Sequence, residues 1–73
     1  MSQILNEEHR FRIGSKLNEL REEQGLTYRE LAERAGLSYS NINKIIKGKY
    51  SVGLDVLQKM ADALGADVTI TKR

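Results

Sequence analysis

Six glycines and no prolines divide this chain into short segments, and this division limits what it can fold into. Five of the glycines, at positions 25, 36, 48, 53 and 65, fall at breaks between apolar periodic stretches, where glycine can end or begin a helix. The sixth, Gly14, lies inside the first stretch and should cost a helix about 1 kcal/mol relative to alanine. With 73 residues the chain forms one domain at most, which we expect over 1–73 with a core at 11–65.

The spacing of apolar residues predicts two longer helices, one at each end of this core. The first covers Glu7–Gln24, has Asn6 as its N-cap, and buries a stripe made of Ile13, Leu17 and Leu20. The last covers Leu54–Leu64 and buries a stripe made of Leu54, Leu57, Met60, Ala61 and Leu64. Phe11 falls off the first stripe, which leaves two interpretations: a surface aromatic, or a contact with the tail of the chain or with a second subunit.

Two shorter helices are predicted between them. Thr27 and Glu30 form a capping box that starts a helix over Tyr28–Ala35. Ser38 is the expected N-cap of the next helix, over Tyr39–Lys47. One side of that helix is apolar, with Ile42, Ile45 and Ile46, and the opposite side is polar, with Ser40, Asn43, Lys44 and Lys47, and with Tyr39 and Asn41 at its margins.

The two short helices and the glycine turn between them match the helix-turn-helix pattern. Ala32 is small enough for the helices to approach closely at a steep angle. Any small helical bundle can contain two helices joined by a glycine turn. A DNA-binding interpretation therefore also needs evidence from the charge distribution and from the polar face of the second helix. A polar face of Ser, Asn, Lys and Tyr can reach base edges in a major groove, whereas a merely solvated face would more often mix Glu and Lys.

Charge is distributed unevenly along the chain. The net charge is only +2, but residues 34–54 contain four basic residues and no acid, so the rest of the chain sums to −2. A DNA surface requires basic charge on the docking face rather than over the whole molecule. The candidate DNA-binding residues are therefore Thr27, Tyr28, Ser38, Tyr39, Ser40, Asn41, Asn43, Lys44, Lys47, Lys49, Tyr50 and Ser51.

Each candidate also has a simpler interpretation. The lysines could only keep the surface soluble, although no acid interleaves them. Tyr39, Ser40 and Asn43 could read bases, touch phosphate or touch nothing, and Asn41 could only flank the turn. Thr27 is first of all a helix cap.

In the tail after the last helix, apolar and polar residues alternate, and residues 68–71 are all β-branched. This pattern predicts a strand at 67–71. A single strand is unstable in water, so it needs a partner. The partner could be Gln3–Leu5 or the same strand of a second copy, and a disordered tail is the alternative. In the paired form Val68 and Ile70 would pack on the bundle near Met60 or Leu64.

Composition argues against several other classes of function. The chain has no Cys and a single His, His9, so we expect no metal and no cofactor. Its small core and few catalytic groups argue against an enzyme. No apolar run approaches the roughly 18 residues of a membrane span, and Met1–Gln3 does not open a signal segment, so we expect a cytoplasmic protein without a membrane partner.

The sequence resembles the Cro/repressor-type helix-turn-helix family, also called the xenobiotic response element family. The resemblance covers about Phe11 to Gly65 and rests on Gly25–Ser38, Asn41–Ile45, Gly48–Lys49 and Leu57–Gly65. It implies an all-α, lambda-repressor-like bundle of four or five helices that binds double-stranded operator DNA as a homodimer. The recognition helix would be Tyr39–Lys47, and the protein would be a transcriptional regulator, most simply a repressor of a palindromic operator.

The sequence departs from this family at two places. Members often carry an acid two residues before the glycine of the Gly-Lys pair, where it pairs with a basic residue late in the first helix. Here Ile46 takes that place while Arg21 is present, so Arg21 must stay solvated or find another acid. The strand-like tail is more similar to members that include antitoxins, which leaves an alternative function: a module that binds a toxin protein and autoregulates its operon.

Overall fold

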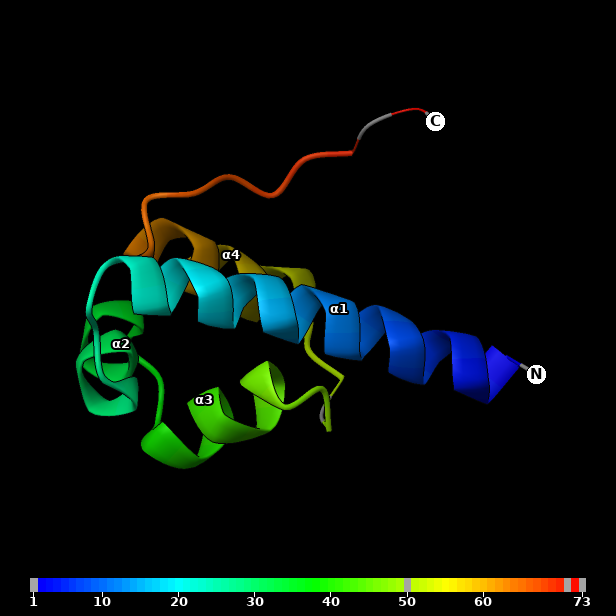
Figure 1. The fold of residues 1–73 in the computed structure, drawn as a ribbon, viewed down its shortest axis with the longest axis horizontal. Helices are drawn as coiled ribbons and strands as arrows, with labels where there is room; N and C mark the ends of the chain where they lie inside the picture. Colours follow the sequence, from blue (N-terminus) through cyan, green and yellow to red (C-terminus); the bar gives the residue numbers. More distant parts are fainter. Residues whose placement is uncertain (1, 50, 71, 73) are drawn as a thin grey trace.

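A computed structural model describes residues 2–49, 51–70 and 72, and the side chains from residue 8 onward within these ranges. It contains four helices, as the sequence predicts: α1 (Ser2–Glu23), α2 (Tyr28–Ala35), α3 (Tyr39–Ile46) and α4 (Leu54–Ala63) (Figure 1). The long helix α1 crosses the molecule, with α4 along one side of it and α2 and α3 on the other. Helix α3 packs against both α1 and α2, and α2 also packs against α4.

Helices α2 and α3 begin where their capping residues predict. The Glu30 backbone N–H donates to the Thr27 hydroxyl at 3.1 Å, and the Thr27 N–H donates to the Glu30 carboxylate at 2.8 Å, which completes the capping box. The Asn41 N–H donates to the Ser38 hydroxyl at 3.1 Å. Strong local caps explain why these two starts could be located from the sequence.

Helix α1 differs from its prediction at the N-terminal end. It begins at Ser2 instead of Glu7, so Asn6 lies within the helix and is not its N-cap. No glycine or proline stands between Ser2 and Glu7, and a single asparagine is only mildly unfavourable inside a helix. The helix therefore continues through the residue that was expected to start it.

The core gathers apolar residues from all four helices and the loops between them. Its buried members are Leu17, Leu26, Leu31, Ala32, Ile42, Ile45, Ile46, Met60 and Leu64. Two residues of the predicted stripes are exposed instead, Ile13 at 44% and Leu54 at 79%. Leu54 is the first residue of α4, and Ile13 borders an open groove, so neither is covered by a neighbouring helix.

The tail forms no strand within residues 66–70, and Thr71 lies outside the described residues. The predicted internal partner, Gln3–Leu5, is part of α1, so its backbone is helical and cannot pair as an extended strand. Ile70 is fully exposed, which corrects the expectation that it packs on the bundle. Val68 lines a groove of about 310 Å³ between α1, α4 and the tail, and neither Met60 nor Leu64 lines this groove.

Gly14 lies at the closest approach between α1 and α3. A Cβ at this position would lie 2.4 Å from the carbonyl oxygen of Ile46 and 2.6 Å from that of Ile45. These distances are below any real contact, and the opposing atoms are backbone, which cannot move aside by a rotamer change. The glycine that weakens α1 locally is therefore what allows α3 to pack against it.

We expect Gly14→Ala to destabilise the protein by about 1–3 kcal/mol, because the added methyl group would overlap the α3 backbone. Helix propensity alone predicts the opposite sign, a gain of about 1 kcal/mol. Urea unfolding followed by circular dichroism measures the difference, with Lys16→Ala, an exposed site on the same helix, as the control. A stabilised Gly14→Ala variant would show that the contact does not constrain the fold.

Candidate nucleic-acid interface

Helix α3 separates its apolar and polar residues onto opposite faces. Ile42, Ile45 and Ile46 are buried against the core. Of the candidate residues at the start of α3 and along it, Ser38, Tyr39, Ser40, Lys44 and Lys47 are exposed, and Asn41 and Asn43 are half-buried. The polar face predicted from the sequence is therefore turned away from the core and is open to a partner.

Four of these residues share one shallow hollow on the surface of α3. Tyr39, Ser40, Asn43 and Lys44 line a depression of about 240 Å³. Together they offer hydroxyl, amide and ammonium groups, which are the donors and acceptors that recognise base edges. An eight-residue helix is about 12 Å long, which matches the width of a B-DNA major groove.

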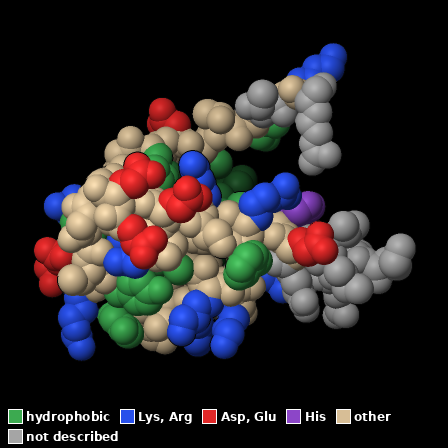
Figure 2. Space-filling view, viewed as in Figure 1, with side chains coloured by type: hydrophobic (Ala, Val, Ile, Leu, Met, Phe, Trp, Pro, Cys, Tyr) green, Lys and Arg blue, Asp and Glu red, His purple; other side chains and the backbone are tan. Residues whose placement is uncertain are grey.

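Basic side chains gather on the same side of the molecule. In Figure 2 the edge below α3 carries Lys and Arg side chains, whereas the Asp and Glu side chains of the drawn face lie mainly over the opposite half. Lys44, Lys47 and Lys49 are all exposed. The charge asymmetry predicted from residues 34–54 is thus also an asymmetry in space.

The candidate residues in the loop after α3 do not all lie on the same surface. The Lys49 N–H donates to the Lys44 carbonyl at 3.0 Å, which holds Lys49 at the end of α3. Ser51 is exposed but borders a separate recess, together with Ile13, Ile45 and other residues of α1 and α4. Tyr50, also predicted from the sequence, lies outside the described residues.

At the start of α2, Thr27 and Tyr28 take different positions. The Thr27 hydroxyl accepts the capping hydrogen bond, so its cap interpretation is confirmed. The half-buried Tyr28 ring packs against Tyr39 with centroids 5.9 Å apart and planes tilted by 50°. This aromatic pair joins the first residue of α2 to the first residue of α3 and so links the two helices of the motif.

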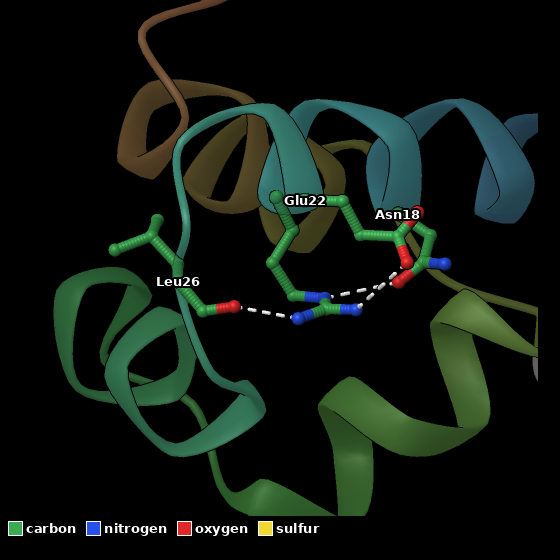
Figure 3. A network of polar contacts seen from close by, with 4 residues as sticks. Asn18, Glu22 and Leu26 are labelled. Atoms are coloured by element: carbon green, nitrogen blue, oxygen red, sulfur yellow. Dashed lines mark hydrogen bonds and ion pairs between the residues drawn. The ribbon is translucent and has the colours of Figure 1, made fainter.

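With Ile46 in place of the acid that family members often carry, Arg21 was expected to stay solvated or to pair with another acid. Its main partners in the structure are of other kinds. Its guanidinium donates to the Leu26 carbonyl at 2.5 Å and to the Asn18 side-chain oxygen at 3.0 Å (Figure 3). Its carbon Cζ lies 4.7 Å from the centre of the Tyr28 ring. The nearest acid, Glu22, is 3.9 Å away and largely exposed, so it is a weak partner. With a side chain only 16% exposed, Arg21 is held by a carbonyl, an amide and an aromatic face.

Sequence reasoning did not identify Arg29 as part of this surface. Its Cζ lies 5.3 Å from the centre of the Tyr39 ring, so it extends the stack formed by Arg21, Tyr28 and Tyr39. The sequence did offer one indication of this role, because Arg29 follows the candidate residue Tyr28 in the first turn of α2. The contact itself crosses from α2 to α3 and has no signature in the local sequence.

Two further properties concern other kinds of site. Within the described residues, no group of three or more His, Asp or Glu side chains is placed to hold a metal ion. None of the helices described is long and apolar enough to span a membrane.

Comparison with known proteins supports the same assignment. Residues 17–70 match the model of a helix-turn-helix family. The transcriptional regulator PuuR of Escherichia coli K12 is 38% identical over 56 residues, which cover 77% of this chain and 30% of the relative. An uncharacterised helix-turn-helix regulator of Methanothermobacter thermautotrophicus is 43% identical over 51 residues, covering 70% of this chain and 74% of that protein.

Two further proteins extend the comparison. The immunity repressor of Bacillus phage phi105 is 37% identical over 57 residues, which cover 78% of this chain and 40% of the repressor. The chain therefore spans well under half the length of PuuR and of this repressor. The crystal structure of the restriction-modification controller protein C.AhdI from Aeromonas hydrophila superimposes with a TM-score of 0.76 at 33% identity, covering 78% of this chain and 86% of that one. None of these proteins is named as an antitoxin, so the comparisons give the toxin-binding alternative no support.

The capping box of α2 makes stability depend on pH. The Thr27 backbone N–H, then the Thr27 hydroxyl and the charge of Arg34, lower the pKa of Glu30 below its ordinary value of 4.5. A lowered folded-state pKa means that this stabilisation is present above pH 4.5 and is lost as the pH falls through the folded-state pKa.

We expect Glu30→Gln, which keeps a side-chain acceptor but cannot ionise, to be less stable than the parent protein at pH 7. The difference should shrink at pH 3, because the charge-dependent stabilisation is lost as the pH falls below 4.5 towards the lowered folded-state pKa of Glu30. Urea unfolding at the two pH values measures this. Glu33→Gln, which removes an exposed carboxylate from the same helix without touching the cap, is the control. An equal difference at both pH values would mean that the cap does not depend on charge.

Proposed function

This chain belongs to the Cro/repressor-type helix-turn-helix family, and from that membership we propose that it is a sequence-specific DNA-binding transcriptional regulator. The observation that carries the proposal is the outer face of α3, which is polar and basic without an interleaved acid and is as long as the major groove is wide. The relatives named as transcriptional regulators support the same role.

The residues of the interface divide into two roles. Tyr39, Ser40, Asn43 and Lys44 share the hollow on α3 and read base edges. Lys47 and Lys49 lie at the end of α3 and bind backbone phosphates, which fixes the register of the protein without reading sequence. The remaining predicted contacts stay part of the proposal without an assigned role: Thr27, Tyr28, Ser38, Asn41 and Ser51, together with Tyr50, which lies outside the described residues.

The regulator acts as a repressor by binding a palindromic operator as a homodimer. The similarity to a phage immunity repressor supports repression. A single eight-residue helix reads only a few base pairs, so a specific site requires two half-sites, about 34 Å apart along the DNA. Exposed apolar residues on α4 and the tail, Leu54, Val68 and Ile70, offer surface for a second subunit.

This role is one of binding, and the chain needs no catalytic group of its own to block or recruit a polymerase. It requires access to chromosomal DNA, which supports the cytoplasmic location expected from the sequence. Partner choice is set by the side chains of α3, since the fold alone serves many different ligands.

Selection of binding sites from random duplexes, at a stated salt concentration, tests the assignment of α3. We expect the parent protein to enrich a palindromic site. Asn43→Ala and Lys44→Ala should each lose preference at one base position, at a cost of about 1–3 kcal/mol. Lys59→Ala, on α4, is the control and should return the parent site. If both α3 variants also return the parent site, α3 is not the reading helix.

Binding should also depend strongly on salt. If each subunit neutralises three to four phosphates, a dimer should show a slope of log affinity against log salt of about −5 to −7. Lys49→Ala should weaken binding to all sequences alike and flatten the slope by about 1 per subunit, whereas Lys59→Ala should leave it unchanged. Fluorescence anisotropy at several salt concentrations gives the slope, and measurable binding with a slope near zero would refute phosphate anchoring.

A further inference from the structure

A second basic hollow lies where α1 meets the loop after α3. Arg10, Phe11, Lys47, Gly48 and Lys49 line a depression of about 420 Å³. Three of these residues are cationic, and none of the described residues that line the hollow is acidic. Two of them, Arg10 and Phe11, belong to α1 and were not among the residues predicted to contact DNA.

The backbone of α1 and that of the loop are in direct contact at this hollow. Gly48 has a φ of +71°, and a Cβ on it would lie 2.7 Å from the Cα of Phe11. The Arg10 Nε donates to the Gly48 carbonyl at 3.4 Å. Among the described residues, no partner is found for the other two guanidinium nitrogens of Arg10. The hydrogen bond to Gly48 places Arg10 beside Lys47 and Lys49 in this hollow.

The hollow continues the polar face of α3. Lys47 follows Asn43 by four residues and Ser40 by seven, so these side chains share one helix face. The first hollow on this face holds the proposed base-reading residues, and the second lies past the C-terminal end of the helix. Because α3 is about as long as the groove is wide, its C-terminal end reaches the wall of the groove, which is a phosphate backbone.

We propose that Arg10 and Phe11 of α1 join Lys47 and Lys49 in one site that binds a DNA backbone phosphate flanking the half-site. The inference rests on the proposed DNA-binding function and adds α1 to its interface. The guanidinium nitrogens that do not contact Gly48 have the spacing to bind a phosphate bidentately. The Phe11 side chain, 63% exposed, supplies an apolar wall for the adjoining deoxyribose.

A competing explanation is that Arg10 only stabilises the C-terminal end of α3. Its bond to the Gly48 carbonyl places a positive charge near the negative end of the helix dipole. This structural role would change stability but not the number of counterions released on binding. The salt dependence of affinity therefore separates the two explanations.

The variant Arg10→Gln keeps a donor for the Gly48 carbonyl but removes the charge. Its binding is measured by fluorescence anisotropy on a duplex with one half-site of the selected operator and its flank. We expect affinity to fall about tenfold and the salt slope to fall by about 0.9. Arg10→Lys should retain the slope. Arg12→Gln is the matched control, because Arg12 is exposed on the same helix and does not line the hollow.

Neutral methylphosphonate groups, placed singly at each flanking phosphate, locate the contact. One position should weaken the parent protein about tenfold and weaken Arg10→Gln clearly less, because only Lys47 and Lys49 still contact that phosphate in the variant. Unfolding of each variant in urea reports any loss of stability separately. If Arg10→Gln has the salt slope of the parent and is weakened like the parent by each methylphosphonate, this inference is wrong. In that case a reduced salt slope for Lys49→Ala would still support the proposed function. If the parent protein binds no duplex, the proposed function fails instead.

Discussion

The contact of Gly14 with the carbonyl oxygens of Ile45 and Ile46 sets the position of everything that follows in this fold. Because no side chain separates the two backbones, α3 can lie against α1 with its three isoleucines directed into the core. A helix held on its apolar side in this way must present its opposite side to solvent, and that side is polar and basic. Gly48, just after α3, makes the same kind of close backbone contact with Phe11 of α1. The packing of α3 and its following loop on α1 therefore depends on two residues without a Cβ.

The second constraint is the orientation of α2 relative to α3. A row of two packed aromatics with a cation at each end, Arg21, Tyr28, Tyr39 and Arg29, runs from α1 across the starts of both helices. A largely buried guanidinium is unfavourable unless its donors are satisfied, and here the Leu26 carbonyl and Asn18 satisfy them in place of the acid that related proteins often carry. The replacement of that acid by Ile46 therefore adds an apolar residue to the core without leaving Arg21 unpaired.

The parts of this structure that could be predicted from the sequence are those with local causes. The caps at Thr27 and Ser38 involve residues three positions apart, so the starts of α2 and α3 were predictable to the residue. The start of α1 was not, because no glycine or proline between Ser2 and Glu7 stops the helix at the predicted N-cap. The strand was not found, because Gln3–Leu5, the one partner expected within the chain, is helical and not extended. Arg10 and Arg29 were missed because their contacts join separate elements, and no local pattern reports such contacts.

The local caps and the distant glycine contact also imply an order of folding. The capping box of α2 and the serine cap of α3 need only neighbouring residues, so this pair of helices can form early and on its own. The contact of Gly14 with Ile45 and Ile46 must close the whole loop of chain that contains α2, and it brings no apolar side chain of its own to offset that entropy. The contact at Gly14 closes together with the burial of Leu17 of α1, so we expect the folding and unfolding rates of a Gly14 variant to show at which stage α1 docks.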